Sequence, residues 1–313
     1  MITIEHVYLL TGAMVLVFAV LSARDRSNPR RWGNAAFWGL LALSFLAGSH
    51  VSDFWNGMVV IALVAVGGLG LMHKGAAATS TPEARAASAV RRGNALFGPA
   101  LIVPVLALLG TLLLKNSGWI EPKQVTLICL SLGVLIALAV CYVWLRPPLL
   151  APAQEGRRLI DTIGWAAVLP QMLASLGAVF ALAGVGGAVG HLASDWLPLG
   201  TPLAAAIAYC LGMALFTFVM GNAFAAFPVM TAAIGLPLIV HRFGGDPAIM
   251  SAIGMLAGFC GTLLTPMAAN FNLVPAALLE LPDRHGVIRA QAPTALILLA
   301  ANTALMAGLV YRF

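Results

Sequence analysis

The sequence predicts an all-α integral membrane protein with about eight membrane-spanning helices and one re-entrant helical hairpin. Of its 313 residues, 61% are hydrophobic and 9% are charged, whereas a soluble domain carries about 25% charged residues. Apolar stretches of membrane-crossing length recur along the chain between short polar loops. One further apolar stretch has an asparagine where a polar loop would be expected. The chain is therefore expected to be embedded in a lipid bilayer.

Ordinary spans are expected wherever about 20 apolar residues follow one another, because a helix of that length crosses the hydrocarbon core. These stretches lie at 4–21, 35–50, 55–72, 94–114, 125–145, 163–190 and 292–311. Small residues near the end of the stretch 163–190 are expected to let a neighbouring helix pack closely. They are Gly184, Gly186, Gly187 and Gly190.

The distribution of basic residues predicts the orientation of the chain. Most of the 17 Lys and Arg residues lie in alternate loops, at 22–34, 73–93, 146–162 and 280–291. Because basic loops stay in the cytoplasm, the N-terminus is expected on the outer side of the membrane. The membrane itself is expected to be the inner membrane of a bacterium. The net charge of +6 then reflects membrane topology, and no binding of nucleic acid is expected.

The titratable residues predict neither a catalytic site nor a metal site. Asp161, Asp195, Asp246 and Asp283 are expected at the ends of spans. The cysteines form no CxxC pair, and the histidines show no metal-ligand spacing. An intramembrane enzyme would need an acid or a base at membrane depth, so the sequence does not predict an enzyme.

The segment 202–240 is expected to be a re-entrant hairpin. From Leu203 to Val240 it carries no formal charge, and Gly221, Asn222 and Ala223 stand at its middle. Non-helical backbone is tolerated at membrane depth only where it is buried in protein or lines a cavity. The tip is therefore a candidate binding site. Two full spans, with Asn222 as a helix-packing amide, fit the charge pattern equally well.

The segment 247–279 is expected to be a broken helix. Fully helical, it would measure about 50 Å, against a hydrocarbon core of about 30 Å. Thr265 and Pro266 lie at its middle and are followed by Asn270 and Asn272. Proline removes a backbone donor and interrupts a helix. A simple proline kink, with the amides capping the freed carbonyls, is the alternative interpretation.

The linker at 146–162 separates two regions of different character. Residues 1–145 contain plain spans and a soluble connection at 73–93, which is expected to be a cytoplasmic linker. This region is expected to be scaffold-like. Residues 146–313 contain both irregular, amide-bearing segments and are expected to form the transport-like region.

The second region resembles one repeat of the ion-transporter superfamily, which includes divalent-anion/sodium symporters. The resemblance lies in the order of Phe180 to Leu197, then Gly221-Asn222-Ala223 to Pro228, then Gly254 to Asn270. It implies an elevator-type half transporter in which a hairpin tip, often Ser-Asn-Thr, faces a broken helix. Gly221 and Ala223 stand where that superfamily usually has hydroxyls, which argues against a sodium site of its type.

The whole chain also resembles a narrower family, catalogued as domain of unknown function 979. The resemblance rests on Met1 to Glu5, on Ser27-Asn28-Pro29-Arg30-Arg31 and on Phe37-Trp38-Gly39-Leu40. Members are typically encoded beside a shorter membrane protein, number 969, and beside enzymes of 5-oxoproline metabolism. This implies a two-component transporter, with 5-oxoproline or a related small acid as its substrate.

The number of irregular segments independently predicts a partner. Superfamily symporters contain two inverted repeats, each with a hairpin and a broken helix, and transporters built in this way bind substrate where the repeats meet. Here 202–279 contains one such pair, and 1–145 contains no second charge-free double run with a central asparagine. A small companion membrane protein is therefore expected to form a hetero-oligomer with this chain.

The resulting hypothesis is a subunit of a secondary transporter, a symporter for a small carboxylate. No Lys or Arg lies between Arg158 and Arg242, so backbone N–H groups and amides would hold the anion. No organic cofactor is expected, and Na⁺ or H⁺ would be the coupling cation. A channel or an assembly subunit, and an intramembrane enzyme, are the competing interpretations. The predicted substrate-binding residues are Gly221, Asn222, Ala223, Thr265, Pro266, Asn270 and Asn272.

Overall fold

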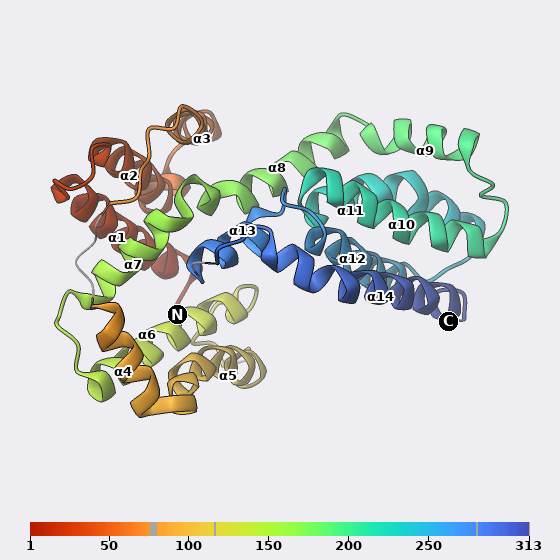
Figure 1. Cartoon of the computed structure of the whole chain (residues 1–313). Helices are drawn as coiled ribbons and strands as arrows, with labels where there is room; N and C mark the ends of the chain where they lie inside the picture. The colour runs from red at the N-terminus through yellow and green to blue at the C-terminus, as the bar shows by residue number, and fades with distance from the viewer. Residues whose placement is uncertain (76–79, 116, 280, 313) are drawn as a thin grey trace. The chain divides into compact units, whose positions relative to one another are not determined.

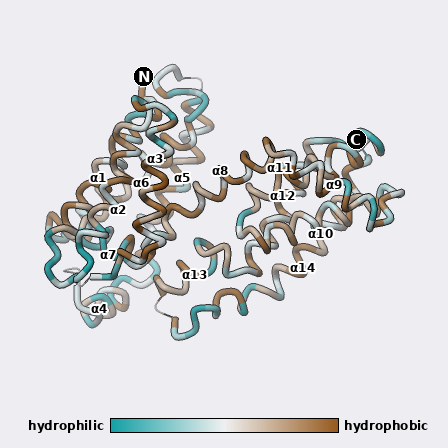
Figure 2. Tube along the Cα trace, turned by 90° about the horizontal axis from the view of Figure 1, so that it is seen from above, coloured by the Kyte–Doolittle hydropathy of each residue, from teal (hydrophilic) through white to brown (hydrophobic). Residues whose placement is uncertain are grey.

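The computed structural model describes residues 1–75, 80–115, 117–279 and 281–312, and these residues are almost entirely helical (Figure 1). The predicted all-α membrane class is confirmed, because the described residues contain 6 helices that are long and apolar enough to cross a membrane. Figure 2 shows the apolar residues along these helices, with hydrophilic residues concentrated in the connections. The 6 helices are Ile4–Arg24, Glu83–Leu114, Val125–Leu145, Pro202–Met220, Ala223–Arg242 and Gly286–Leu309.

The chain forms two compact units, Met1–Trp165 and Ala166–Phe313. The linker 146–162, expected to separate two regions, forms a helix that packs against the first helix of unit 1. The boundary between the two units, after Trp165, therefore follows this linker and does not lie within it. The connection 73–93, of which 76–79 lie outside the described residues, contains a short helix that Thr81 caps by accepting a hydrogen bond from the Ala84 N–H.

Unit 1 contains two closely packed pairs of helices. α1 packs along α2, and α5 packs along α6. Glycines bring the partners together: a Cβ on Gly12 would meet Leu46, and one on Gly110 would meet Cys129. The helices are α1 (Ile4–Arg24), α2 (Arg31–Ala47), η1 (Gly48–His50), α3 (Asp53–Gly68), α4 (Pro82–Arg92), η2 (Gly93–Leu96), α5 (Phe97–Leu114), α6 (Val125–Leu145) and α7 (Ala151–Ile163). The short helix η3 (Gly164–Val168) joins the units.

Unit 2 has a core in which α10, α12 and α14 pack against one another (Figure 1). Tyr209, Met213, Met250 and Met306 are fully buried there. Glycine permits the closest approach, since a Cβ on Gly261 would lie 2.2 Å from the Ala214 carbonyl oxygen. The helices are α8 (Leu169–Leu182), α9 (Val185–Trp196), α10 (Pro202–Met220), α11 (Ala223–Met230), η4 (Thr231–Arg242), α12 (Pro247–Leu263), α13 (Ala269–Leu278) and α14 (Gly286–Leu309).

The segment 202–240 forms two arms that meet at Gly221. α10 is the first arm, and α11 continues into the π-helix η4 as the second. α10 packs against both parts of the returning arm. The arms have 19 and 20 residues and the apolar character of membrane spans. A hairpin and two full spans are both compatible with these lengths.

The stretch 163–190, expected to be one span, is bent. The helices Ser175–Leu182 and Val185–Trp196 meet at an angle of 70°. The turn lies at Gly184, whose φ of +69 is a left-handed conformation that glycine adopts without steric cost. The predicted close packing is present at Gly186 and Gly190, where an added Cβ would lie 3.0 Å from the Val229 carbonyl oxygen and 2.9 Å from that of Ala233. Gly187 has open space around it.

Candidate functional site

The turn between α10 and α11, at Gly221 and Asn222 and called the tip below, lies directly against the break between α12 and α13. Gly221 has a φ of +75, and its Cα faces the backbone of the break. A Cβ at this position would lie 2.5 Å from the Met267 carbonyl oxygen and 3.0 Å from the Ala268 nitrogen. The structure thus brings together the two segments in which the sequence predicts substrate-binding residues.

Asn222 and Ala223 begin the returning arm and are buried beside α12. The Asn222 Oδ1 accepts a hydrogen bond of 2.7 Å from the Phe224 N–H, which caps α11. Among the described residues no partner is found for its Nδ2 group. Asn222 is 8% exposed and Ala223 is 1% exposed. A Cβ on Gly258 of α12 would lie 3.1 Å from the Ala223 Cβ. The tip is therefore closely packed, and the Asn222 Nδ2 group is available to donate a hydrogen bond.

The segment 247–279 is a broken helix, as the sequence predicts. α12 ends at Leu263 and α13 begins at Ala269. Thr265 is 1% exposed, and its Oγ1 accepts a hydrogen bond of 3.2 Å from the Met267 N–H. Pro266 is exposed. The break is thus a short irregular link, with one buried hydroxyl that stabilises its turn.

Asn272 is engaged within the protein. Its Nδ2 donates to the carbonyl oxygens of Thr262 and Thr265, at 2.8 and 2.6 Å. Gln291 of α14 donates from its Nε2 to the Leu263 carbonyl and to the Asn272 Oδ1. These are the contacts of an amide that caps freed carbonyls, the alternative that the sequence left open. The role of Asn272 as a ligand stays a prediction, and its internal contacts compete with that role.

Asn270 has a different environment on the first turn of α13. Its side chain is half-buried. The hydrogen bonds found in the described part of the chain do not use its amide. Of the two asparagines after the break, Asn270 is the one whose amide remains available to a ligand.

Thr217 is a candidate residue that the sequence analysis missed. It lies one turn before the tip on α10, and its carbonyl accepts a hydrogen bond of 2.6 Å from the Gly221 N–H. The residue is fully buried, and its Oγ1 has no hydrogen-bond partner among the described residues. A buried hydroxyl without a hydrogen-bond partner is unfavourable, and a bound group that accepts or donates a hydrogen bond there would relieve this cost. Its position in the sequence could have indicated it, because Thr217 carries the last hydroxyl before Asn222 on an otherwise apolar arm.

The electrostatic character of the site comes from helix ends. The C-termini of α10 and α12 and the N-termini of α11 and α13 lie at the tip and the break. Helix N-termini present unpaired N–H groups to anions, and C-termini present carbonyls to cations. From Leu197 to Val240 and from Pro247 to Leu279 no residue carries a formal charge. The arrangement can therefore bind a small ion of either sign through backbone groups.

The cavities beside α10 are apolar and do not contain the polar tip residues. One, of about 610 Å³, lies between α9 and α10 and extends to Val219 and Met220. Another, of about 640 Å³, lies on the other side of α10. Neither is lined by Asn222, Thr265 or Asn270. The tip and the break are in contact in this conformation, so a ligand between them requires their separation.

No group of three or more His, Cys, Asp or Glu side chains that could hold a metal ion is found among the described residues. The coordination available at the tip is therefore that of backbone oxygens, hydroxyls and amides. Such oxygen ligands suit hard cations better than soft ones such as Cu⁺.

The comparisons with known proteins identify a family. No curated protein and no solved structure matches the chain. One family model matches residues 5–311, which is nearly the whole sequence. Its description is "Protein of unknown function (DUF979)". The resemblance of the whole chain to this narrower family is therefore confirmed over both units. The chain belongs to the DUF979 family.

Proposed function

We propose that this protein is the membrane-embedded subunit of a secondary transporter for a small carboxylate, for which 5-oxoproline is the preferred candidate. The observation that carries the proposal is the contact between Gly221 and the backbone at Met267 and Ala268. In this contact the turn between α10 and α11 lies against the break after α12, in a region without formal charge. The proposal is supported by the general transporter design in which the ends of interrupted helices face substrates and ions.

The carboxylate would bind to N–H groups at the start of α11 and α13. These are the positive ends of the helices, and they accommodate an anion without a cationic side chain. The Nδ2 group of Asn222 and the amide of Asn270 would bind the rest of the ligand, because an amide both donates and accepts hydrogen bonds. A lactam carbonyl and N–H would satisfy both functions, which favours 5-oxoproline over a simple aliphatic acid.

A coupling cation would bind on the carbonyl side of the same site. Thr217 supplies a buried hydroxyl without a partner, and the last carbonyls of α10 lie beside it. Na⁺ accepts such neutral oxygen ligands. H⁺ would need a titratable group, and the charge-free tip region offers none. The site composition therefore favours Na⁺ as the ion bound at the tip.

The active unit would be a hetero-oligomer with a small companion membrane protein. Unit 2 contains one hairpin and one broken helix, and a midplane site between inverted repeats needs two such pairs. A companion chain would supply the second pair. The membrane would be the bacterial inner membrane, with the basic loops in the cytoplasm.

An assembly subunit without its own transport is the second candidate function. The engagement of Asn272 by Thr262, Thr265 and Gln291 favours it, because this amide has a structural use. In that case the packed tip would be a structural joint. Uptake of labelled substrate separates the two functions, since a carrier saturates and depends on Asn222.

The decisive experiment measures uptake of labelled 5-oxoproline by cells that express this chain with its companion. Saturable uptake that Asn222→Ala abolishes, and that Asn302→Ala leaves intact, supports the carrier. Asn302 is the matched control because it is an amide in the same unit with only a weak contact, 3.6 Å from the Cys260 sulfur. Uptake that is unaffected by Asn222→Ala contradicts the site.

A further inference from the structure

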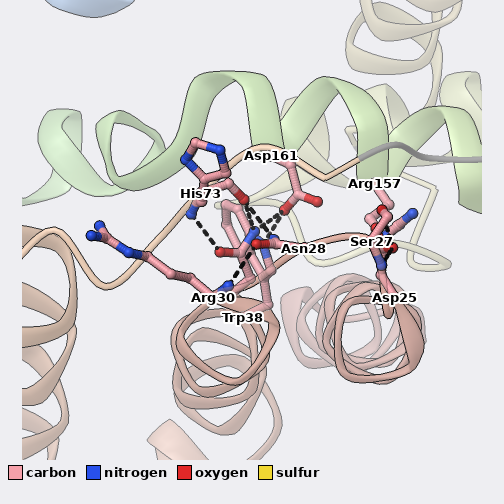
Figure 3. Close-up of polar contacts among 9 residues, drawn as sticks. Asp25, Ser27, Asn28, Arg30, Trp38, His73, Arg157 and Asp161 are labelled. Carbon is pink, nitrogen blue, oxygen red and sulfur yellow. Dashed lines mark hydrogen bonds and ion pairs between the residues drawn. The ribbon is translucent and has the colours of Figure 1, made fainter.

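Unit 1 contains a buried cluster of polar side chains, none of which belongs to the candidate site in unit 2. α7 projects two charged side chains, Arg157 and Asp161, from one face toward α1 and α2 (Figure 3). They are one helical turn apart, 5% and 8% exposed. Charged side chains are rarely buried to this extent unless they are paired. The partners of each side chain therefore decide what the cluster does.

Arg157 is paired with the acid at the end of α1. Its Nη1 lies 2.8 Å from the Asp25 Oδ2, and both side chains are less than a tenth exposed. Asp25 also accepts hydrogen bonds from the backbone and the hydroxyl of Ser27. Burial raises the pKa of the Asp25 carboxyl, but the bonds from Ser27 and Arg157 outweigh it and hold the pKa below the ordinary value of 3.8. Asp25 is thus a stable carboxylate with its own counter-charge.

In the described part of the chain, both hydrogen-bond partners of Asp161 are neutral. Its Oδ1 accepts from the Asn34 Nδ2 at 3.0 Å and from the Trp38 Nε1 at 2.9 Å. Asn34 cannot turn its oxygen toward Asp161, because that oxygen accepts from the His73 N–H at 2.9 Å. Both contacts are therefore donor-to-acceptor bonds to one oxygen, and they persist whether or not the other oxygen carries a proton.

The charges of the cluster do not balance. It contains two acids, Asp25 and Asp161, and one base, Arg157, whose guanidinium contacts Asp25. An ionised Asp161 would leave one buried negative charge without a counter-ion. The energetically favoured response of such a group is to take up a proton. Burial raises the pKa of Asp161, although the bonds from Trp38 and Asn34 and the charge of Arg157 act against it.

The other charged groups on the surrounding elements are engaged elsewhere or exposed. Arg30 donates to the Gly70 carbonyl, and Arg158 pairs with Glu155 at 2.8 Å. Arg31 lies over the Trp32 ring. The His73 and Lys74 residues are exposed. No cation among the described residues besides Arg157 therefore acts on Asp161 at short range.

We propose that Asp161 is a proton-binding site, which takes one H⁺ from the aqueous phase at the basic loops and thereby secures α7 on α1 and α2. The carboxylate plus a proton gives the neutral acid, with the proton on Oδ2 while Oδ1 keeps its bonds to Asn34 and Trp38. The docked helix binds the proton more tightly than an undocked one. The contribution of Asp161 to docking is largest below its own pKa and is lost as pH rises through the pKa of the docked form.

The experiment compares the purified full-length protein with three variants over a range of pH. Infrared difference spectroscopy follows the C=O stretch of protonated carboxyls, and thermal unfolding follows stability. In the parent protein we expect a carboxyl that titrates above its ordinary range, and a melting temperature that falls as it ionises. Asp161→Asn should remove this infrared band and this pH dependence while it keeps the acceptor for Asn34 and Trp38.

Two further variants separate a proton site from a purely structural acid. Trp38→Phe removes a bond that favours the charged form, so the infrared titration should move to higher pH. Asp25→Asn leaves Arg157 buried without its carboxylate partner and should lower the melting temperature at neutral pH. Because the charge of Asp25 raises the pKa of Asp161, the Asp161 band should remain but titrate at lower pH in this variant. The proposal is overturned if Asp161→Asn keeps the parent's pH dependence, or if the parent shows no carboxyl titrating above the ordinary range.

Discussion

Gly221 and Met267 are in direct backbone contact, although 202–240 and 247–279 are separate segments of the chain. A Cβ on Gly221 would lie 2.5 Å from the Met267 carbonyl oxygen, closer than real Cβ atoms approach a backbone oxygen. Any side chain at this position would therefore push the tip and the break apart. The contact joins the turn at Gly221 to the break between α12 and α13, and it can be tested by substitution.

Gly221→Ala should destabilise unit 2 more than an ordinary glycine replacement does. The left-handed backbone alone costs about 1–2 kcal/mol for an alanine, and the contact with Met267 adds a steric term. Gly244→Ala is the control, because its φ is +69 and an added Cβ would meet nothing within 4 Å. The difference in melting temperature between the two variants then measures the steric effect of the contact with Met267. Equal losses would mean that the tip and the break are not packed together.

Asn222→Ala should weaken ligand binding about 10- to 150-fold, which corresponds to about 1.5–3 kcal/mol for one hydrogen bond to a charged partner. The loss of the α11 cap should lower stability by about 1 kcal/mol. Ligand affinity is measured in reconstituted protein, beside Asn302→Ala as the control. Asn222→Asp would keep the cap acceptor and add a negative charge, so it should be more stable than the alanine variant yet bind the anion poorly.

Thr217→Val should raise or preserve stability and lower transport. The buried hydroxyl has no partner in the described part of the chain, and replacing an unpaired polar group by an apolar one of the same shape is neutral or stabilising. Loss of Na⁺-dependent uptake at unchanged melting temperature would assign the hydroxyl to the cation. Ser131→Ala, on α6 in unit 1, is the hydroxyl control, since its Oγ bonds to the Leu127 carbonyl of its own helix. Parent-like uptake by Thr217→Val would remove Thr217 from the site.

Asn272→Ala and Gln291→Ala should each destabilise the break by about 1–3 kcal/mol, because buried carbonyls lose their donors. The two amides also bond to each other, so the double variant should lose less than the sum of the single losses. Chemical denaturation measures this coupling. If either single variant instead lost affinity at unchanged stability, its amide would be a ligand and not a cap.

Expression of this chain without its companion should give no uptake, while co-expression should restore it. The reason is structural: one hairpin and one broken helix form half of the site that inverted-repeat transporters use. Uptake of labelled 5-oxoproline, with the amount of each chain determined by immunoblot, is the measurement. Full activity of the single purified chain would favour a homodimer.

The membrane fold and the two irregular segments could be predicted from the sequence, because each depends on a local property. Hydropathy identifies α1, α6 and α14, and Pro266 accounts for the break. The contact of Gly221 with Met267 could not be derived from composition, since it depends on how α10 and α12 pack. The bend at Gly184 was missed because glycines are also frequent in straight membrane helices.

Side-chain partners were harder to predict than backbone breaks. Asn270 and Asn272 look alike in the sequence, yet only Asn272 reaches the carbonyls of Thr262 and Thr265. Likewise Asp161 is near a loop in the sequence and was expected at the end of a span, whereas α7 buries it beside Trp38. Pattern analysis identifies which residues are polar but does not tell which of them are already satisfied by a neighbour far along the chain.

The two arms of the hairpin differ in mechanical stiffness. α10 is an uninterrupted α-helix of 19 residues from Pro202 to Met220. The returning arm contains Pro228 and Pro237 and changes from an α-helix to a π-helix. Prolines and π-turns weaken the ladder of internal hydrogen bonds and are the places where helices bend. If the tip moves, α10 is therefore expected to stay straight, while the returning arm bends at its prolines and in the π-helix.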